Sequence, residues 1–98
     1  MICHIVLIRL QESLTEAEVS AFMSEARTVL GAIDEVRNLR VGRGLGVKAE
    51  VDHPVALVMD FEDEDALERY QVHPEHRRFV ESIVGPIQAD KRVYDYRT

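Results

Sequence analysis

The segment from Tyr70 to His76, with the sequence Tyr-Gln-Val-His-Pro-Glu-His, brings a phenol and two imidazoles close together in the chain. Phenol and imidazole groups can transfer protons, and imidazole is the one that titrates near neutral pH. Tyr70 and His76 would diverge on one continuous helix, but a turn at Pro74 lets them converge on one cavity. The spacing therefore predicts an acid–base site. The alternative is structural, with His73 satisfying backbone groups at a helix break and Tyr70 packed in the core.

A further imidazole, that of His4, lies in the opening run Ile2–Leu10, which is rich in β-branched residues and predicts a strand. Because side chains alternate along a strand, His4 shares one face with Val6 and Ile8. We expect this face to form the floor of the cavity. The alternative for His4 is a buried histidine that is hydrogen-bonded within the protein.

The other elements follow from capping signals and hydrophobic periodicity. The capping box Thr15-Glu16-Ala17-Glu18 begins a helix whose apolar residues recur every 3.6 residues up to Gly31, which supplies a stop signal. Pro74 opens a second helical stretch that Gly85-Pro86 ends. The sequence also predicts strands at Val36–Val41, Val55–Phe61 and Lys91–Tyr96, a helix at Glu64–Tyr70, and a loop from Gly42 through Pro54.

The order of these elements predicts a single ferredoxin-like α+β domain over residues 1–98. In this β-α-β-β-α-β arrangement two helices cover one face of a four-stranded antiparallel sheet. Ile2–Leu10 and Val55–Phe61 are apolar on both faces, so the face without helices also needs cover. We expect a homodimer that buries this sheet face against a second copy. Two facing sheets would form an eight-stranded barrel with room for one small ligand.

The charge balance excludes some partners. The chain has 18 Asp and Glu against 12 Lys and Arg, and its net charge of -6 argues against binding to nucleic acid or an anionic membrane. The single cysteine, Cys3, cannot form an internal disulfide, and the opening run lacks the features of a signal peptide. We therefore expect a cytoplasmic protein. No metal or cofactor is expected, because the spacing of His4, His73 and His76 fits no familiar ligand pattern.

The sequence resembles the stress-responsive A/B barrel domain (Dabb) family, within the dimeric α+β barrel superfamily. The resemblance covers nearly the whole chain and is carried by Met1–Ile8, Val41-Gly42, Ala56–Phe61, Ala66–Tyr70, the signature His73-Pro74-Glu75-His76, and Asp95-Tyr96. It implies a ferredoxin-like protomer that dimerises through its sheet. That implication agrees with the uncovered apolar face.

The resemblance also bears on activity, because the family includes stress-induced plant proteins and a polyketide cyclase that acts by intramolecular aldol condensation. It implies catalytic roles for His76, as a base, and for Tyr70, as a donor to an enolate oxygen, and it implies that His4 lines the pocket. Cyclising relatives add polar groups where this chain has Ala26 and Val55. This difference argues against a polyketide substrate and leaves a smaller carbonyl compound.

The expected function is the binding of a small, partly apolar carbonyl or phenolic metabolite in the barrel, with cofactor-independent, lyase-like or cyclase-like acid–base chemistry. The expected ligand-binding residues are His4, His73, Val6 and Val55, beside the catalytic pair Tyr70 and His76. Two alternatives stay open. One is a non-catalytic, stress-associated binding protein, and the other is a monooxygenase-like or isomerase-like enzyme of the same superfamily.

Overall fold

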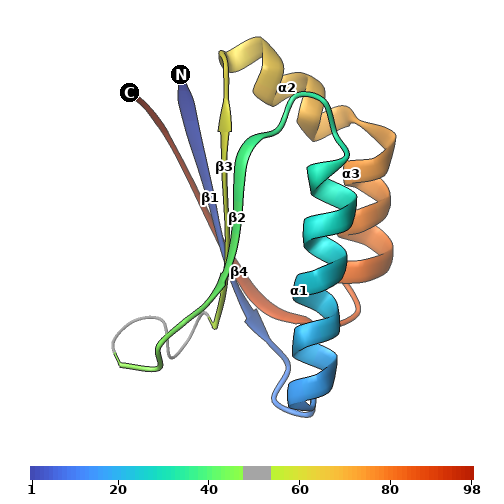
Figure 1. The fold of residues 1–98 in the computed structure, drawn as a ribbon. Helices are drawn as coiled ribbons and strands as arrows, with labels where there is room; N and C mark the ends of the chain where they lie inside the picture. Colours follow the sequence, from blue (N-terminus) through green and yellow to red (C-terminus); the bar gives the residue numbers. More distant parts are fainter. Residues whose placement is uncertain (48–53) are drawn as a thin grey trace.

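A four-stranded antiparallel sheet carries the helices on one of its faces (Figure 1). The structure is a computed structural model that describes residues 1–47 and 54–98. Within them the elements are β1 (Ile2–Leu10), α1 (Glu16–Gly31), β2 (Arg37–Arg43), β3 (Val55–Phe61), α2 (Glu64–Val72), α3 (Pro74–Arg78), the π-helical turn η2 (Phe79–Val84) and β4 (Gln88–Arg97). The strand order is β2-β3-β1-β4. The predicted ferredoxin-like α+β fold is confirmed.

The two faces of the sheet have different surroundings. The even-numbered residues of β1 and the odd-numbered residues of β3 are buried under the helices and form the sheet side of the core. The alternate residues, such as Ile5 and Val58, are only partly buried, except for the buried Cys3. Because side chains alternate along a strand, they belong to the opposite face, which no helix covers (Figure 1). His4 and Val6 therefore lie on the helix-covered face.

Local capping explains where two of the helices begin. Thr15 and Glu18 form the predicted capping box at the start of α1, with each side chain accepting from the other residue's backbone N–H. Asp63 caps α2 in the same way, because its carboxylate accepts from the N–H of Ala66 at 2.8 Å. Gly31 is the last residue of α1, and Ala32, in an ordinary helical conformation, is the C-cap. The stop therefore does not use a left-handed glycine.

The helical stretch after Pro74 is less regular than the sequence predicts. It starts as α3 and widens into η2, where the N–H of Gly85 donates to the carbonyl of Val80, five residues earlier, at 2.8 Å. This wider turn lies in the segment that carries the buried residues Phe79 and Val84. A pattern of apolar residues does not distinguish a π-helical turn from an α-helical one.

Two strands extend beyond their predicted bounds. β4 covers Gln88–Arg97 instead of Lys91–Tyr96, because it pairs with the full length of β1. β2 runs from Arg37 to Arg43 and contains a register shift at Asn38, whose φ of 51° lies in the left-handed region. The predicted loop therefore begins later, and its residues 48–53 lie outside the described residues. None of the helices in the described part of the chain has both the length and the apolar character needed to cross a membrane.

Candidate functional site

A cavity of about 150 Å³ lies between the helix-covered face of the sheet and the helical segments α2, α3 and η2. Its polar lining residues are His4, Tyr70, Gln71, His76 and Lys91, and its apolar lining residues are Val6, Ile8, Leu57, Phe79, Val80, Val84 and Val93. The cavity therefore belongs to one protomer. The sequence pattern instead places the ligand between two facing sheets. The position differs because the face with His4 packs under the helices and so points away from the open side of the sheet.

The rings of His4, Tyr70 and His76 meet at this cavity. The centroid of the Tyr70 ring lies 4.2 Å from that of His76 and 5.8 Å from that of His4. Phe61 packs behind them, with its centroid 4.9 Å from that of Tyr70. His73-Pro74 separates α2 from α3, so Tyr70 and His76 stand on two helices and face the same space. The structure thus brings three of the predicted site residues together.

The Tyr70 side chain is a buried phenol whose hydroxyl has no partner among the described residues. Only 2% of the residue is exposed, and burial raises the pKa of the phenol far above its ordinary value. The hydroxyl therefore keeps its proton at physiological pH. Buried hydroxyls are normally hydrogen-bonded to protein or water. Tyr70 is thus a hydrogen-bond donor available to a molecule in the cavity.

The His76 ring is oriented by a backbone contact. Its Nδ1 lies 3.2 Å from the carbonyl oxygen of Gln71. Because a carbonyl can only accept, Nδ1 carries the proton and Nε2 of the neutral ring is the unprotonated nitrogen. Burial is the main cause that lowers the pKa of His76, and the contact with Gln71 opposes it. At neutral pH the ring is therefore a base.

The His4 ring is held by Asp95, a residue that sequence reasoning missed. Nδ1 of His4 is hydrogen-bonded to the carboxylate of Asp95, and His4 is 5% exposed. The antiparallel register of β1 and β4 puts these two residues directly opposite each other. The carboxylate fixes the proton on Nδ1, so Nε2 is the nitrogen that is free to meet a ligand. In the sequence, Lys91, Val93 and Asp95 alternate and so share one face of β4, and this could have indicated that the face is partly polar. The alternation does not indicate which residues of β1 lie opposite them.

Two predicted ligand-binding residues lie elsewhere. His73 is the N-cap of α3, and its Nδ1 accepts from the N–H of Glu75 at 3.1 Å. Val55 is fully buried in the core at the start of β3 and does not line the cavity. Val6 does line it. The contact of His73 is therefore the one that the structural alternative predicts, in which the side chain satisfies a backbone group at the helix break. The cavity lining also includes Gln71 and Lys91, which the sequence analysis did not single out.

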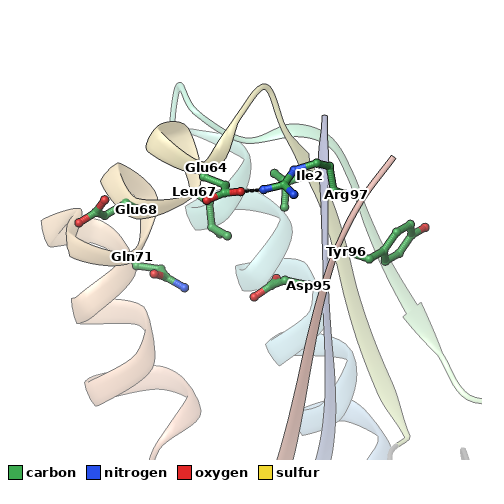
Figure 2. A pocket seen from close by; sticks show the side chains of 8 residues that line it. All are labelled: Ile2, Glu64, Leu67, Glu68, Gln71, Asp95, Tyr96 and Arg97. Atoms are coloured by element: carbon green, nitrogen blue, oxygen red, sulfur yellow. Dashed lines mark ion pairs between the residues drawn. The ribbon is translucent and has the colours of Figure 1, made fainter.

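A second, open hollow of about 500 Å³ adjoins the cavity at the end of β4 beside α2 (Figure 2). Gln71 lines both hollows, and Asp95 lines the outer one while holding His4 in the inner one. An ion pair between Glu64 and Arg97 links α2 to β4 here. Figure 2 shows Asp95 and its neighbour Tyr96 leaving β4 on opposite sides. Asp95 therefore connects solvent to the buried imidazole.

Within residues 1–47 and 54–98, no group of three or more His, Cys, Asp and Glu side chains is placed to hold a metal ion. His4 and His76 each use Nδ1 in a contact with the protein, and His73 uses its Nδ1 as a cap. The chemistry available at the cavity is therefore that of a phenol, two imidazoles and an ammonium group. Such groups bind polar atoms and move protons.

The fold and the site together define the class of this protein. It is a ferredoxin-like α+β protein with a small, imidazole-lined cavity under its helices. The family model of the Stress Responsive A/B Barrel Domain (Dabb) matches residues 2–98, so the chain belongs to this family. A Dabb family protein from Mesorhizobium loti has 29% identity and a TM-score of 0.89, over 99% of this chain and 95% of that one. Comparison with the curated proteins finds no match.

Two further solved structures are similar to this chain. A protein of unknown function from Thermobifida fusca, described as dimeric and ferredoxin-like, has 31% identity and a TM-score of 0.84, over 99% of this chain and 90% of that one. The hydroxynitrile lyase from Passiflora edulis has 17% identity and a TM-score of 0.82, over 97% of this chain and 90% of that one. The second likeness concerns the fold alone.

Proposed function

We propose that this protein is a cofactor-independent acid–base catalyst that binds a small, partly apolar carbonyl compound in the cavity under α2 and α3. One observation supports the proposal above all others. The rings of Tyr70 and His76 lie in contact at a largely apolar cavity, with centroids 4.2 Å apart. The buried Tyr70 hydroxyl has no partner among the described residues, and the His76 imidazole is neutral at neutral pH. A buried donor beside a buried base is the arrangement needed to form an enolate.

The proposed chemistry is the removal of a proton from the carbon next to a carbonyl group. Tyr70 donates a hydrogen bond to the carbonyl oxygen and stabilises the negative charge that develops there. Nε2 of His76 takes the proton and later returns it to carbon or to a leaving group. His4, held by Asp95, lines the floor of the cavity with Val6. His73 and Val55 are left out, because neither lines the cavity.

The size of the cavity favours a compact substrate. About 150 Å³ is the volume that accommodates a molecule of roughly benzene size. A short ketone or aldehyde fits this space, whereas an extended polyketide does not. The name of the Passiflora edulis relative, hydroxynitrile lyase, supports the idea that this fold can carry lyase chemistry on small molecules.

Hydrogen–deuterium exchange tests the proposal directly. A panel of small ketones and aldehydes in D₂O is followed by proton NMR, with and without the enzyme. We expect the protein to accelerate the loss of α-proton signals, and we expect His76→Ala to abolish the acceleration while the variant stays folded. Arg77→Ala is the control, because Arg77 is exposed on α3 and does not line the cavity.

The outcomes separate the open alternatives. Binding without exchange, seen as shifts of cavity resonances, would favour a non-catalytic binding protein. An enzyme that acts only when a redox cofactor is supplied would favour the monooxygenase-like alternative. A His76→Ala variant that unfolds, tested by circular dichroism, would make His76 a structural residue and overturn its catalytic role.

We also propose that the protein is a homodimer joined through the sheet face that carries no helix. Ile5 lies at the centre of this face, flanked by Val58 on β3 and Tyr94 on β4. Tyr94 is 67% exposed, and Tyr96 on the same strand is also exposed. Contiguous apolar surface of this kind is a feature of interaction sites. The dimeric relative from Thermobifida fusca supports this assembly.

A further inference from the structure

Lys91 places a positive charge at the wall of the cavity. It pairs with Ile8 in the register of β1 and β4, so it lies on the same sheet face as His4 and Val6. It lines the cavity together with Tyr70 and the other polar residues. Its charge is also felt by His76, where it is one of the minor causes of a lowered pKa. Lys91 is exposed to solvent at the wall of the cavity, and its flexible side chain can reach a molecule at the proposed site.

The charge of Lys91 is not neutralised by any of the described residues. Basic side chains elsewhere in the described chain form ion pairs with carboxylates, namely Arg40, Arg43, Arg69, Arg78, Arg92 and Arg97. The chain as a whole has an excess of acidic residues, yet none of the acidic residues that the structure describes lines this cavity. Asp90, the neighbour of Lys91 in sequence, pairs with Arg92.

The position of the lysine complements that of Asp95. Both residues lie on one face of β4, four residues apart, which corresponds to about 13 Å along a strand. At one end the carboxylate of Asp95 is occupied by His4. At the other end the cation of Lys91 has no carboxylate counterpart among the described residues. A ligand in the cavity therefore meets a positive charge on its Lys91 side.

We infer that Lys91 selects substrates that carry a carboxylate, so that the substrate class of the proposed site is a short keto acid. The inference rests on the proposed function, because the hydrogen bond from Tyr70 fixes the carbonyl and Lys91 then fixes the anion. A lysine ammonium is a compact point charge on a flexible stem, which suits a carboxylate whose exact position varies among substrates.

A matched pair of ligands tests this inference. Pentan-2-one and 4-oxopentanoate share a methyl ketone and a five-carbon chain, and they differ in one terminal methyl group against a carboxylate. Dissociation constants are measured by NMR titration at fixed ionic strength for the wild type, Lys91→Met, Lys91→Arg and Arg92→Met. Arg92 is the charge-matched control, because it pairs with Leu7 in the register and so points to the opposite face.

We expect the wild type to bind 4-oxopentanoate about tenfold more tightly than pentan-2-one. Lys91→Met should erase this preference and leave the affinity for pentan-2-one within about twofold, whereas Lys91→Arg and Arg92→Met should keep it. The inference would be overturned if the wild type bound the two ligands equally, or if the preference survived in Lys91→Met. Neither result would contradict the proposed binding of a carbonyl group by Tyr70. If neither ligand binds, nor any ketone or aldehyde of the panel, the proposed function fails and the inference fails with it.

Discussion

At the residue scale, Tyr70 combines two properties that rarely occur together. Its hydroxyl is buried, and no described residue accepts a hydrogen bond from it. Removal of an unpaired buried hydroxyl is nearly neutral for folding, because no partner loses its hydrogen bond. A hydroxyl kept for structure alone would have a partner. We therefore assign Tyr70 to the proposed site.

The substitution Tyr70→Phe separates these roles. We expect α-proton exchange to fall by about 100-fold, as for the loss of one oxyanion donor. We expect the free energy of unfolding, measured by urea denaturation, to change by less than about 0.5 kcal/mol. Arg77→Ala, on the exposed side of α3, should change neither quantity. A Tyr70→Phe variant with wild-type exchange would contradict the assignment.

His76 should make stability depend on pH. Burial lowers the pKa of this ring below its ordinary value of 6.5, the contact with Gln71 opposes the change, and charges on His4, Lys91 and His73 add to the lowering. Between pH 6.5 and the lowered pKa, the unfolded chain binds a proton that the folded protein does not. The free energy of unfolding is therefore fully retained above pH 6.5 and falls as the pH decreases through this window.

Urea denaturation of the wild type and His76→Gln between pH 8 and pH 5 measures this contribution. We expect the stability of the wild type relative to the variant to decrease as the pH falls below 6.5. The other histidines are present in both proteins, so their contributions to the pH dependence cancel when the two free energies of unfolding are subtracted. Parallel pH profiles for the two proteins would show that the His76 ring is not shielded from solvent.

At the element scale, the break between α2 and α3 decides where the site residues point. His73 is both the C-cap of α2 and the N-cap of α3, and Pro74 occupies the first position of α3. The proline ring is tolerated there because the first N–H of a helix has no partner within the helix. The chain therefore turns sharply without losing a hydrogen bond, and Tyr70 and His76 meet across the turn.

We expect His73→Ala to lower the free energy of unfolding by about 1 kcal/mol, since the N–H of Glu75 loses its acceptor. His73→Asn, which restores a capping oxygen, should recover most of this loss. The measurement is urea denaturation of the three proteins at one fixed pH. If Ala and Asn variants were equally stable, the cap would contribute nothing.

At the scale of the whole molecule, the open face of the sheet is the surface through which we propose that two copies associate. Val58 lies on this face, so Val58→Asp would bury an unpaired carboxylate in the proposed dimer but not in the monomer. We expect sedimentation at micromolar concentration to give twice the chain mass of 11.2 kDa for the wild type. The variant should sediment as a folded monomer, with at least a 100-fold weaker dimer.

Val72→Asp is the matched control, because Val72 is 55% exposed on α2 and lies away from the sheet face. It should leave the dimer intact. Val6→Asp does not test the interface, because Val6 lies on the helix-covered face and lines the cavity. A wild-type protein that sediments only as a monomer would contradict the proposed assembly.

The sequence alone was sufficient for the features that depend on local rules. The short apolar runs Ile2–Leu10 and Val55–Phe61 predict β1 and β3, the capping box predicts the start of α1, and Pro74 predicts the break that lets Tyr70 and His76 converge. The order of the elements then predicts the ferredoxin-like sheet. Each of these rests on residues that are near one another in the chain, so a local pattern carries the information.

The tertiary structure decided which face of the sheet the helices cover, and hence that the cavity lies within one protomer. It also decided the register between β1 and β4, which joins His4 to Asp95 although 91 residues separate them. Lys91 reaches the cavity for the same reason. Strand register over such a distance depends on how all the side chains pack at once, because a slip of one residue would turn every side chain of β4 to the other face. No local pattern in the sequence specifies it.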